Sequence, residues 1–186
     1  MIATVVAMPL AACGSGSDGG GGKAESQQTS AASYVHQICQ SISGFETSVT
    51  AGESKLNALS SGASPNLAKL KTTVTAFFSS AGKASATAKV QIDKAGTPAV
   101  AKGPKIRTAL LTAFQKFSDS FNSAAKQSKT LDATNPTQFK AETLKLQQQL
   151  TTTSQGVSAT LNGLGTSLDA AAKEDSACAA IEGGSN

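Results

Sequence analysis

The thiol and imidazole side chains of this 186-residue chain, which could bind a metal or undergo redox chemistry, belong to three cysteines and a single histidine, Cys13, Cys39, Cys178 and His36. A structural or catalytic zinc site needs at least three protein ligands. His36 lies three residues before Cys39, but the carboxylates closest to it in sequence, Glu25 and Glu46, do not complete such a set. We therefore expect no metal site.

Residue patterns for catalysis are equally sparse. Covalent catalysis needs a nucleophile with an adjacent base and a group that orients it, and one histidine without a defined partner does not provide this. A Ser/Lys dyad stays open because the chain is rich in both residues. The carboxylates Asp169, Glu174 and Asp175 are expected to form a solvated face, and Glu142 with Lys145 an i, i+3 surface pair. The prediction is a protein without catalytic residues or cofactors, and not an enzyme.

The N-terminal residues have a distinctive order. An apolar run from Ile2 to Leu10 is followed by Ala11-Ala12-Cys13 and then by a Gly/Ser tract, Gly14 to Gly22. A leucine, two small residues and a cysteine after an apolar run resembles the lipobox of bacterial lipoproteins. The resemblance covers residues 1–13 and implies that Cys13 carries a diacylglyceryl group and becomes the first residue after cleavage.

The expected organisation follows from this resemblance. Residues 1–12 would be a signal peptide, and the absence of Lys or Arg before the apolar run favours a true start upstream of Met1. Residues 13–30 would be the acylated cysteine and a flexible tether, which follows no strand and so is not a phosphate loop. A helical domain would span 31–182, with a disordered tail at 183–186.

Composition and charge restrict the class of protein further. The chain is 39% hydrophobic but only 4% aromatic, with no Trp. This composition favours helices that pack through small side chains over sheets, which prefer β-branched and aromatic residues. Net charge is +4, from scattered lysines, so a nucleic-acid partner is not expected. No stretch after Cys13 approaches the ~18 to 20 apolar residues of a membrane-spanning helix. The bias towards Ala, Thr, Gly and Ser is typical of a high-GC Gram-positive bacterium.

Counting cysteines predicts a disulfide. If Cys13 is acylated, Cys39 and Cys178 are left, and two thiols in an exported chain usually pair. The loop closed by this bond would contain nearly the whole domain. The chain-entropy model then gives a stabilisation of about 4 to 5 kcal/mol.

Apolar residues spaced alternately by three and four predict an all-α, up-and-down bundle of four long helices. The first helix is expected at 31–60. Ser64 would cap the second, with Pro65 in its first position, and Gly96-Thr97-Pro98 would end it. The third would run from Pro104 to about Leu131 and provide the centre of the core. Asn135 would cap the last segment, which begins at Pro136.

The last segment is too long to match the other three. At about 1.5 Å per residue, one unbroken helix to residue 182 would be about 70 Å long, against about 40 to 45 Å for the others. Cys178 would then lie far from Cys39, although a disulfide needs α-carbons within about 7 Å. We predict a break at Gly163-Leu164-Gly165 that turns the final piece back along the first helix. Sliding of the two helical hairpins is the alternative.

These patterns predict an exported protein anchored to the outer face of the cell membrane through acylated Cys13. Its expected role is a non-enzymatic interaction or scaffold module whose partner is an envelope protein or a wall polymer. Two alternatives remain open. One is a pocket for a small molecule or lipid between the helices, suggested by the alanine-lined second half of the second helix and by the inward positions of Thr143 and Thr153. The other is a membrane-active protein whose amphipathic helices open onto lipid.

Overall fold

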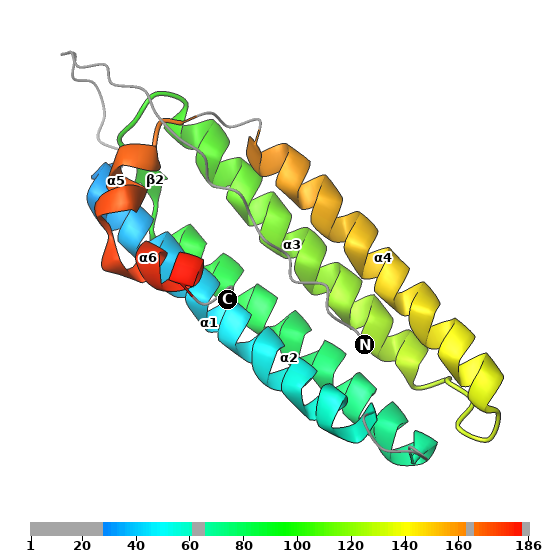
Figure 1. Ribbon diagram of the computed structural model, residues 1–186. Coiled ribbons are helices and arrows are strands. Elements are labelled where there is room, and N and C mark those ends of the chain that lie inside the picture. Colours follow the sequence, from blue (N-terminus) through cyan, green and yellow to red (C-terminus); the bar gives the residue numbers. More distant parts are fainter. Residues whose placement is uncertain (1–27, 61–65, 163–165, 184–186) are drawn as a thin grey trace.

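The computed structural model describes residues 28–60, 66–162 and 166–183. The described residues form an all-α bundle of four long helices and two short ones (Figure 1), which confirms the predicted fold class. The long helices are α1 (Ala31–Ser60), α2 (Leu67–Lys94), α3 (Gly103–Ser128) and α4 (Pro136–Asn162), and the short ones are α5 (Asp169–Glu174) and α6 (Ser176–Gly183). The lipobox-like residues 10–13, the Gly/Ser tract and residues 184–186 lie outside the described residues.

The long helices run alternately up and down, because short connections place consecutive helices side by side. The α2 helix packs extensively on both α1 and α3, and α4 packs along α3. In the described part of the chain, α1 makes no comparable contact with α4. Its other helical neighbours are α5 and α6, which fold back against its N-terminal part (Figure 1).

The aromatic core is centred on α3, as the sequence predicts. Phe114, Phe117 and Phe121 of α3 are all buried. The ring of Phe45 from α1 lies 5.8 Å from those of Phe114 and Phe117 and 6.1 Å from that of Phe121, measured between centroids. Such contacts add to the apolar area removed from water, so these rings tie α1 to α3.

Small residues let α2 and α3 approach closely. Ala81, Ser85 and Ala88 of α2 are almost fully buried. A Cβ atom at Gly82 would lie only 2.7 Å from the side-chain oxygen of Asn122 on α3. The alanine-lined half of α2 is therefore filled by the neighbouring helix.

The helix starts agree with the sequence in one case and correct it in another. Asn135 accepts a hydrogen bond from the backbone N–H of Gln138 at 3.1 Å, and α4 begins at Pro136, as predicted. The predicted Ser64 cap of α2 is wrong, because α2 begins at Leu67 and Asn66 is its N-cap. The Asn66 side chain accepts the backbone N–H of Lys69, three residues on, which is the bond that an N-cap provides.

The segment between α2 and α3 contains an element that the helical pattern does not predict. Strand β2 (Thr97–Pro98) pairs in parallel with β1 (Gln28–Thr29), which immediately precedes α1. The Thr29 hydroxyl also donates to the carbonyl of Ala95 at 2.6 Å. This pairing fixes the start of α1 beside the end of α2.

The last segment is broken, as predicted. Helix α4 ends at Asn162, and the chain continues as α5 and α6 against α1. Residues 163–165, where the sequence places the break, lie outside the described residues. Among the helices that the structure describes, none combines the length and hydropathy needed to cross a bilayer.

Candidate functional site

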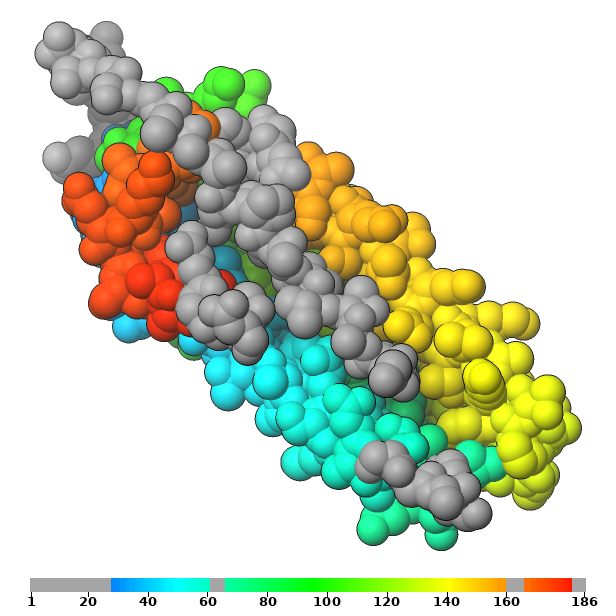
Figure 2. Space-filling model, in the orientation of Figure 1, coloured from blue at the N-terminus to red at the C-terminus, as the bar shows by residue number. Residues whose placement is uncertain are grey.

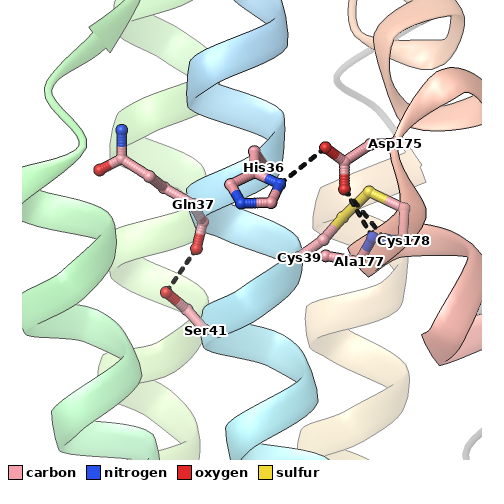
Figure 3. The surroundings of a disulfide bond; sticks show 7 residues. All are labelled: His36, Gln37, Cys39, Ser41, Asp175, Ala177 and Cys178. Carbon is pink, nitrogen blue, oxygen red and sulfur yellow. Dashed lines mark hydrogen bonds and ion pairs between the residues drawn. A yellow bond between two sulfur atoms is a disulfide. The ribbon is translucent and has the colours of Figure 1, made fainter.

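The most elaborate side-chain cluster lies where α6 meets α1 (Figure 3). Cys39 of α1 and Cys178 of α6 form a disulfide across 139 residues of sequence, with their α-carbons 5.0 Å apart. This confirms the predicted bond. Both cysteines are buried beside Val35, with partly buried apolar side chains from α5 and α6 packed around them, namely Ala171, Ala172, Ala177 and Ile181.

Asp175 is the second element of this cluster. It lies between α5 and α6, and its Oδ1 accepts the backbone N–H groups of Ala177 at 2.8 Å and Cys178 at 3.2 Å. Its Oδ2 accepts a hydrogen bond from Nδ1 of His36 on α1 at 2.9 Å. One carboxylate therefore caps α6 and ties it to α1, one helical turn from the disulfide (Figure 3).

The pKa of the Asp175 carboxyl results from opposing effects. Burial of the side chain, which is 14% exposed, raises the pKa. The hydrogen bonds from His36, Ala177 and Cys178 stabilise the charged form and outweigh this, so the pKa lies below its usual value. Asp175 is therefore held as a carboxylate at neutral pH.

His36 has a partner on each ring nitrogen. Nδ1 faces Asp175, and Nε2 lies 2.9 Å from the side-chain nitrogen of Gln40, one turn along α1. With the Gln40 amide donating to Nε2, the ring carries its proton on Nδ1 and donates it to Asp175. The ring is thus held between two side chains, with 45% of its surface exposed.

This cluster is suited to holding α6 on α1. Cys39 and Cys178 are only 6% and 5% exposed, and burial limits attack on the sulfurs by a thiolate. No group of three His, Cys, Asp or Glu side chains in the described ranges could hold a metal ion. The arrangement is that of a covalent link reinforced by a hydrogen-bonded cap.

The structure corrects two expectations about carboxylates. Asp175 does not belong to a solvated face, since it is mostly buried and has three hydrogen-bond donors. Glu142 does not pair with Lys145, because its oxygens accept from the Gln138 side chain at 2.9 Å and from the backbone of Asp132 at 3.4 Å. An aspartate two residues before the apolar part of α6 is an N-cap signal that could have identified Asp175, but no sequence signal pairs it with His36.

The two threonines at inward positions of α4 do not lie in an enclosed pocket in the described part of the molecule. Thr143 donates to the carbonyl of Phe139, and Thr153 bonds Ser120 of α3 at 3.0 Å. Two depressions are open to solvent, one of about 570 Å³ along α4 and one of about 340 Å³ between α3 and α4, and Thr153 borders the smaller one. Neither depression places converging polar groups around an apolar cavity, as binding pockets usually do.

A second polar group is buried near the start of α1. The Tyr34 side chain is fully buried and its hydroxyl has no hydrogen-bond partner. Burial raises its pKa to about 12, although the nearby Arg107 cation acts in the opposite direction. Arg107 itself forms an ion pair with Asp93 of α2, while its Nε has no partner. Tyr34 therefore stays uncharged and contributes mainly apolar contacts.

Comparison with known proteins assigns no family to this arrangement. The chain matches no protein-family model, no curated protein and no solved structure.

Proposed function

We propose that this protein is a lipid-anchored module of the bacterial cell envelope that binds or positions another envelope component without catalysing a reaction. It would be exported and held on the outer face of the membrane by acyl chains on Cys13. The observation that carries the proposal is the order of the N-terminal residues, Leu10-Ala11-Ala12-Cys13 between an apolar run and a Gly/Ser tract.

The disulfide supports export. Disulfides persist in oxidising compartments and are rare where thiol reductants act. The bond between Cys39 and Cys178 also uses both cysteines that remain once Cys13 is set aside. The pairing is therefore consistent with a distinct role for Cys13.

The anchor and the domain have complementary physical properties. Two or three acyl chains give stable attachment, at about 0.8 kcal/mol for each buried methylene group. A Gly/Ser-rich tether behaves as a flexible chain that lets a domain move away from the bilayer. A rigid helical domain on such a tether can reach partners in the surrounding envelope.

Intact mass spectrometry of the membrane-extracted protein tests the anchor. We expect a mass that exceeds the mature chain from Cys13 by a diacylglyceryl or triacyl group. The Cys13→Ser variant should lack this increment and leave the membrane fraction. Treatment with reductant should add one hydrogen atom to each sulfur of Cys39 and Cys178. A full-length, unmodified mass in the membrane fraction would refute the anchor.

A matched variant separates the two roles of cysteine. The Cys39→Ser/Cys178→Ser double variant should keep its acyl group and its membrane location, because only Cys13 is the acylation site. For the binding role, in-cell crosslinking of the anchored protein should recover a defined envelope component. A turnover that survives purification and disappears on a point substitution would show instead that the protein is an enzyme.

A further inference from the structure

In the part of the chain that the structure describes, one face of α1 is covered by other helices along only part of its length. Cys39, Glu46 and Glu53 are spaced by seven residues, so they lie in one row along the helix. Helix α6 covers this row at Cys39. Figure 2 shows α1 continuing past α5 and α6 towards its C-terminal end.

The uncovered part of this row is bordered by apolar side chains. Phe45, Val49 and Leu56 pack against the core but are only partly buried. All buried residues of α1 lie at or before Ser41. We call the surface formed by Phe45, Glu46, Val49, Glu53 and Leu56 the distal face of α1.

Among the described residues, the two carboxylates of the distal face have no counter-ion. Glu46 and Glu53 form no ion pair and no hydrogen bond in the described part of the protein. Glu46 is half-buried and Glu53 is more exposed, and partial desolvation raises the pKa of each carboxyl. A carboxylate that is partly desolvated and unpaired gains most from a cationic partner.

From this arrangement we propose that the distal face of α1 docks an amphipathic helix of another envelope protein, carrying two basic side chains seven residues apart. The docked helix would continue the line of α6 along α1. Its Lys or Arg residues would meet Glu46 and Glu53, about 10 Å apart along α1, and its apolar stripe would cover Phe45, Val49 and Leu56. This inference rests on the proposed binding role and names the partner's chemistry.

Two arguments select this occupant. The first is continuity, since a helix of the same chain already packs on the same row through Ala177, Cys178 and Ile181. The second is charge, because the row changes from an apolar side chain at Cys39 to carboxylates at Glu46 and Glu53. The part of α1 from Ser43 to Ser60, after its last buried residue, is about 27 Å long, enough for about five helical turns.

A pair of synthetic helices tests the proposal with the full chain in detergent. The first is a peptide of about 18 residues with a Leu/Ala stripe and two Lys residues seven apart, and the second has Gln at both Lys positions. Fluorescence anisotropy should show tighter binding of the Lys peptide, decreasing as salt is raised because screening weakens exposed charge pairs. Equal binding of the two peptides would overturn the proposal.

Matched protein variants locate the binding surface. Glu46→Gln/Glu53→Gln should weaken binding of the Lys peptide about tenfold. The control Asp119→Asn/Glu174→Gln removes the same charge from exposed positions on α3 and α5, and should bind like the native protein. If both variants bind the Lys peptide equally weakly, the effect comes from the net charge of the protein and not from Glu46 and Glu53. That result would overturn the proposal.

A second copy of the chain is the competing occupant of the distal face. If Glu46→Gln/Glu53→Gln changes the oligomeric state in analytical ultracentrifugation without peptide, a second copy covers the distal face and the proposal is wrong. Failure of peptide binding in a protein that is acylated and crosslinks to an envelope component would remove this inference alone. Loss of acylation in the mass measurement would remove the proposed function itself.

Discussion

The two ends of α1 carry the same apolar periodicity in different surroundings. At the N-terminal end, Tyr34, Ile38 and Cys39 are buried by neighbouring helices that include α6. At the C-terminal end, Phe45, Val49 and Leu56 are only partly buried, although they continue the same stripe. An apolar stripe thus shows which face of a helix is directed inward, while burial depends on how many neighbours reach it.

Loss of the disulfide at the N-terminal end of α1 should have the largest effect on the stability of the protein. The Cys39→Ser/Cys178→Ser variant should lose about 2 to 5 kcal/mol of unfolding free energy, because the closed loop contains nearly the whole described domain. Urea denaturation followed by circular dichroism measures this loss. Native protein in reductant serves as the control and should lose a similar amount.

The same variant should change the N-terminal end of α1 in particular. Hydrogen exchange of α5 and α6 amides should accelerate more than that of α2 and α3, since short helices depend on docking for stability. Uniform acceleration across all helices would contradict a local role for the link. A loss below about 1 kcal/mol would show that the remaining contacts hold α6 by themselves.

Equivalent truncations at the two ends of α1 should have unequal costs. Ile38→Ala should destabilise the protein by about 2 to 5 kcal/mol, because Ile38 is 7% exposed and a cavity would remain. Leu56→Ala should cost about 1 kcal/mol, because less apolar area is removed from a partly exposed site. Urea midpoints and slopes measured in parallel give both values. Equal costs that depend on protein concentration would mean that another copy buries Leu56.

Acid should weaken the N-terminal end through Asp175. Its pKa is lower in the folded protein than in the unfolded chain, so its stabilising effect is complete above the unfolded value of about 3.9. That effect is lost as pH falls through the lower folded pKa. Asp175→Asn should therefore be less stable than the native protein at pH 7 and lose less stability between pH 5 and pH 2.

Substitution of His36 separates the cap from the link between helices. His36→Gln leaves Asp175 able to cap α6 but removes one donor, so its acid sensitivity should fall between those of the native protein and Asp175→Asn. Unfolding free energies at several pH values provide the comparison. Identical profiles for all three proteins would show that these hydrogen bonds do not contribute to stability.

The smallest effect is expected at Tyr34, within the well-covered end. Tyr34→Phe removes a buried hydroxyl without a partner and keeps the ring, so stability should stay unchanged or rise by up to about 1 kcal/mol. Thermal unfolding at neutral pH measures this. A clear loss of stability would show that the hydroxyl has a bonding partner, such as a buried water molecule.

Much of this architecture is predictable because helix formation depends mainly on residues that are close in sequence. The apolar stripe at 31–60 predicts the observed bounds of α1, and Asn135-Pro136 predicts the observed start of α4. The disulfide follows from counting cysteines, and the broken last segment from helix length. The Ser64 assignment is wrong because Ser64 and Asn66, two residues apart, both favour an N-cap, and it is Asn66 that directly precedes the first residue of α2.

Long-range features are not predictable in this way. His36 and Asp175 are 139 residues apart, and only the return of α5 and α6 along α1 brings them together. The parallel pairing of β1 with β2 likewise depends on two distant segments meeting. The stripe of α4 gives its inward face but does not say whether α3, α1 or both will cover it.

The position of the disulfide also determines how the described domain would carry a pulling force. A force applied between the start of α1 and the end of α6 passes through Cys39 and Cys178 directly, since the bond joins points close to both ends of the described chain. Tension then bypasses α2, α3 and α4, which lie inside the covalent loop. A force applied between the start of α1 and the turn between α3 and α4 would not be carried by the disulfide alone. It would act on the contacts between the helices.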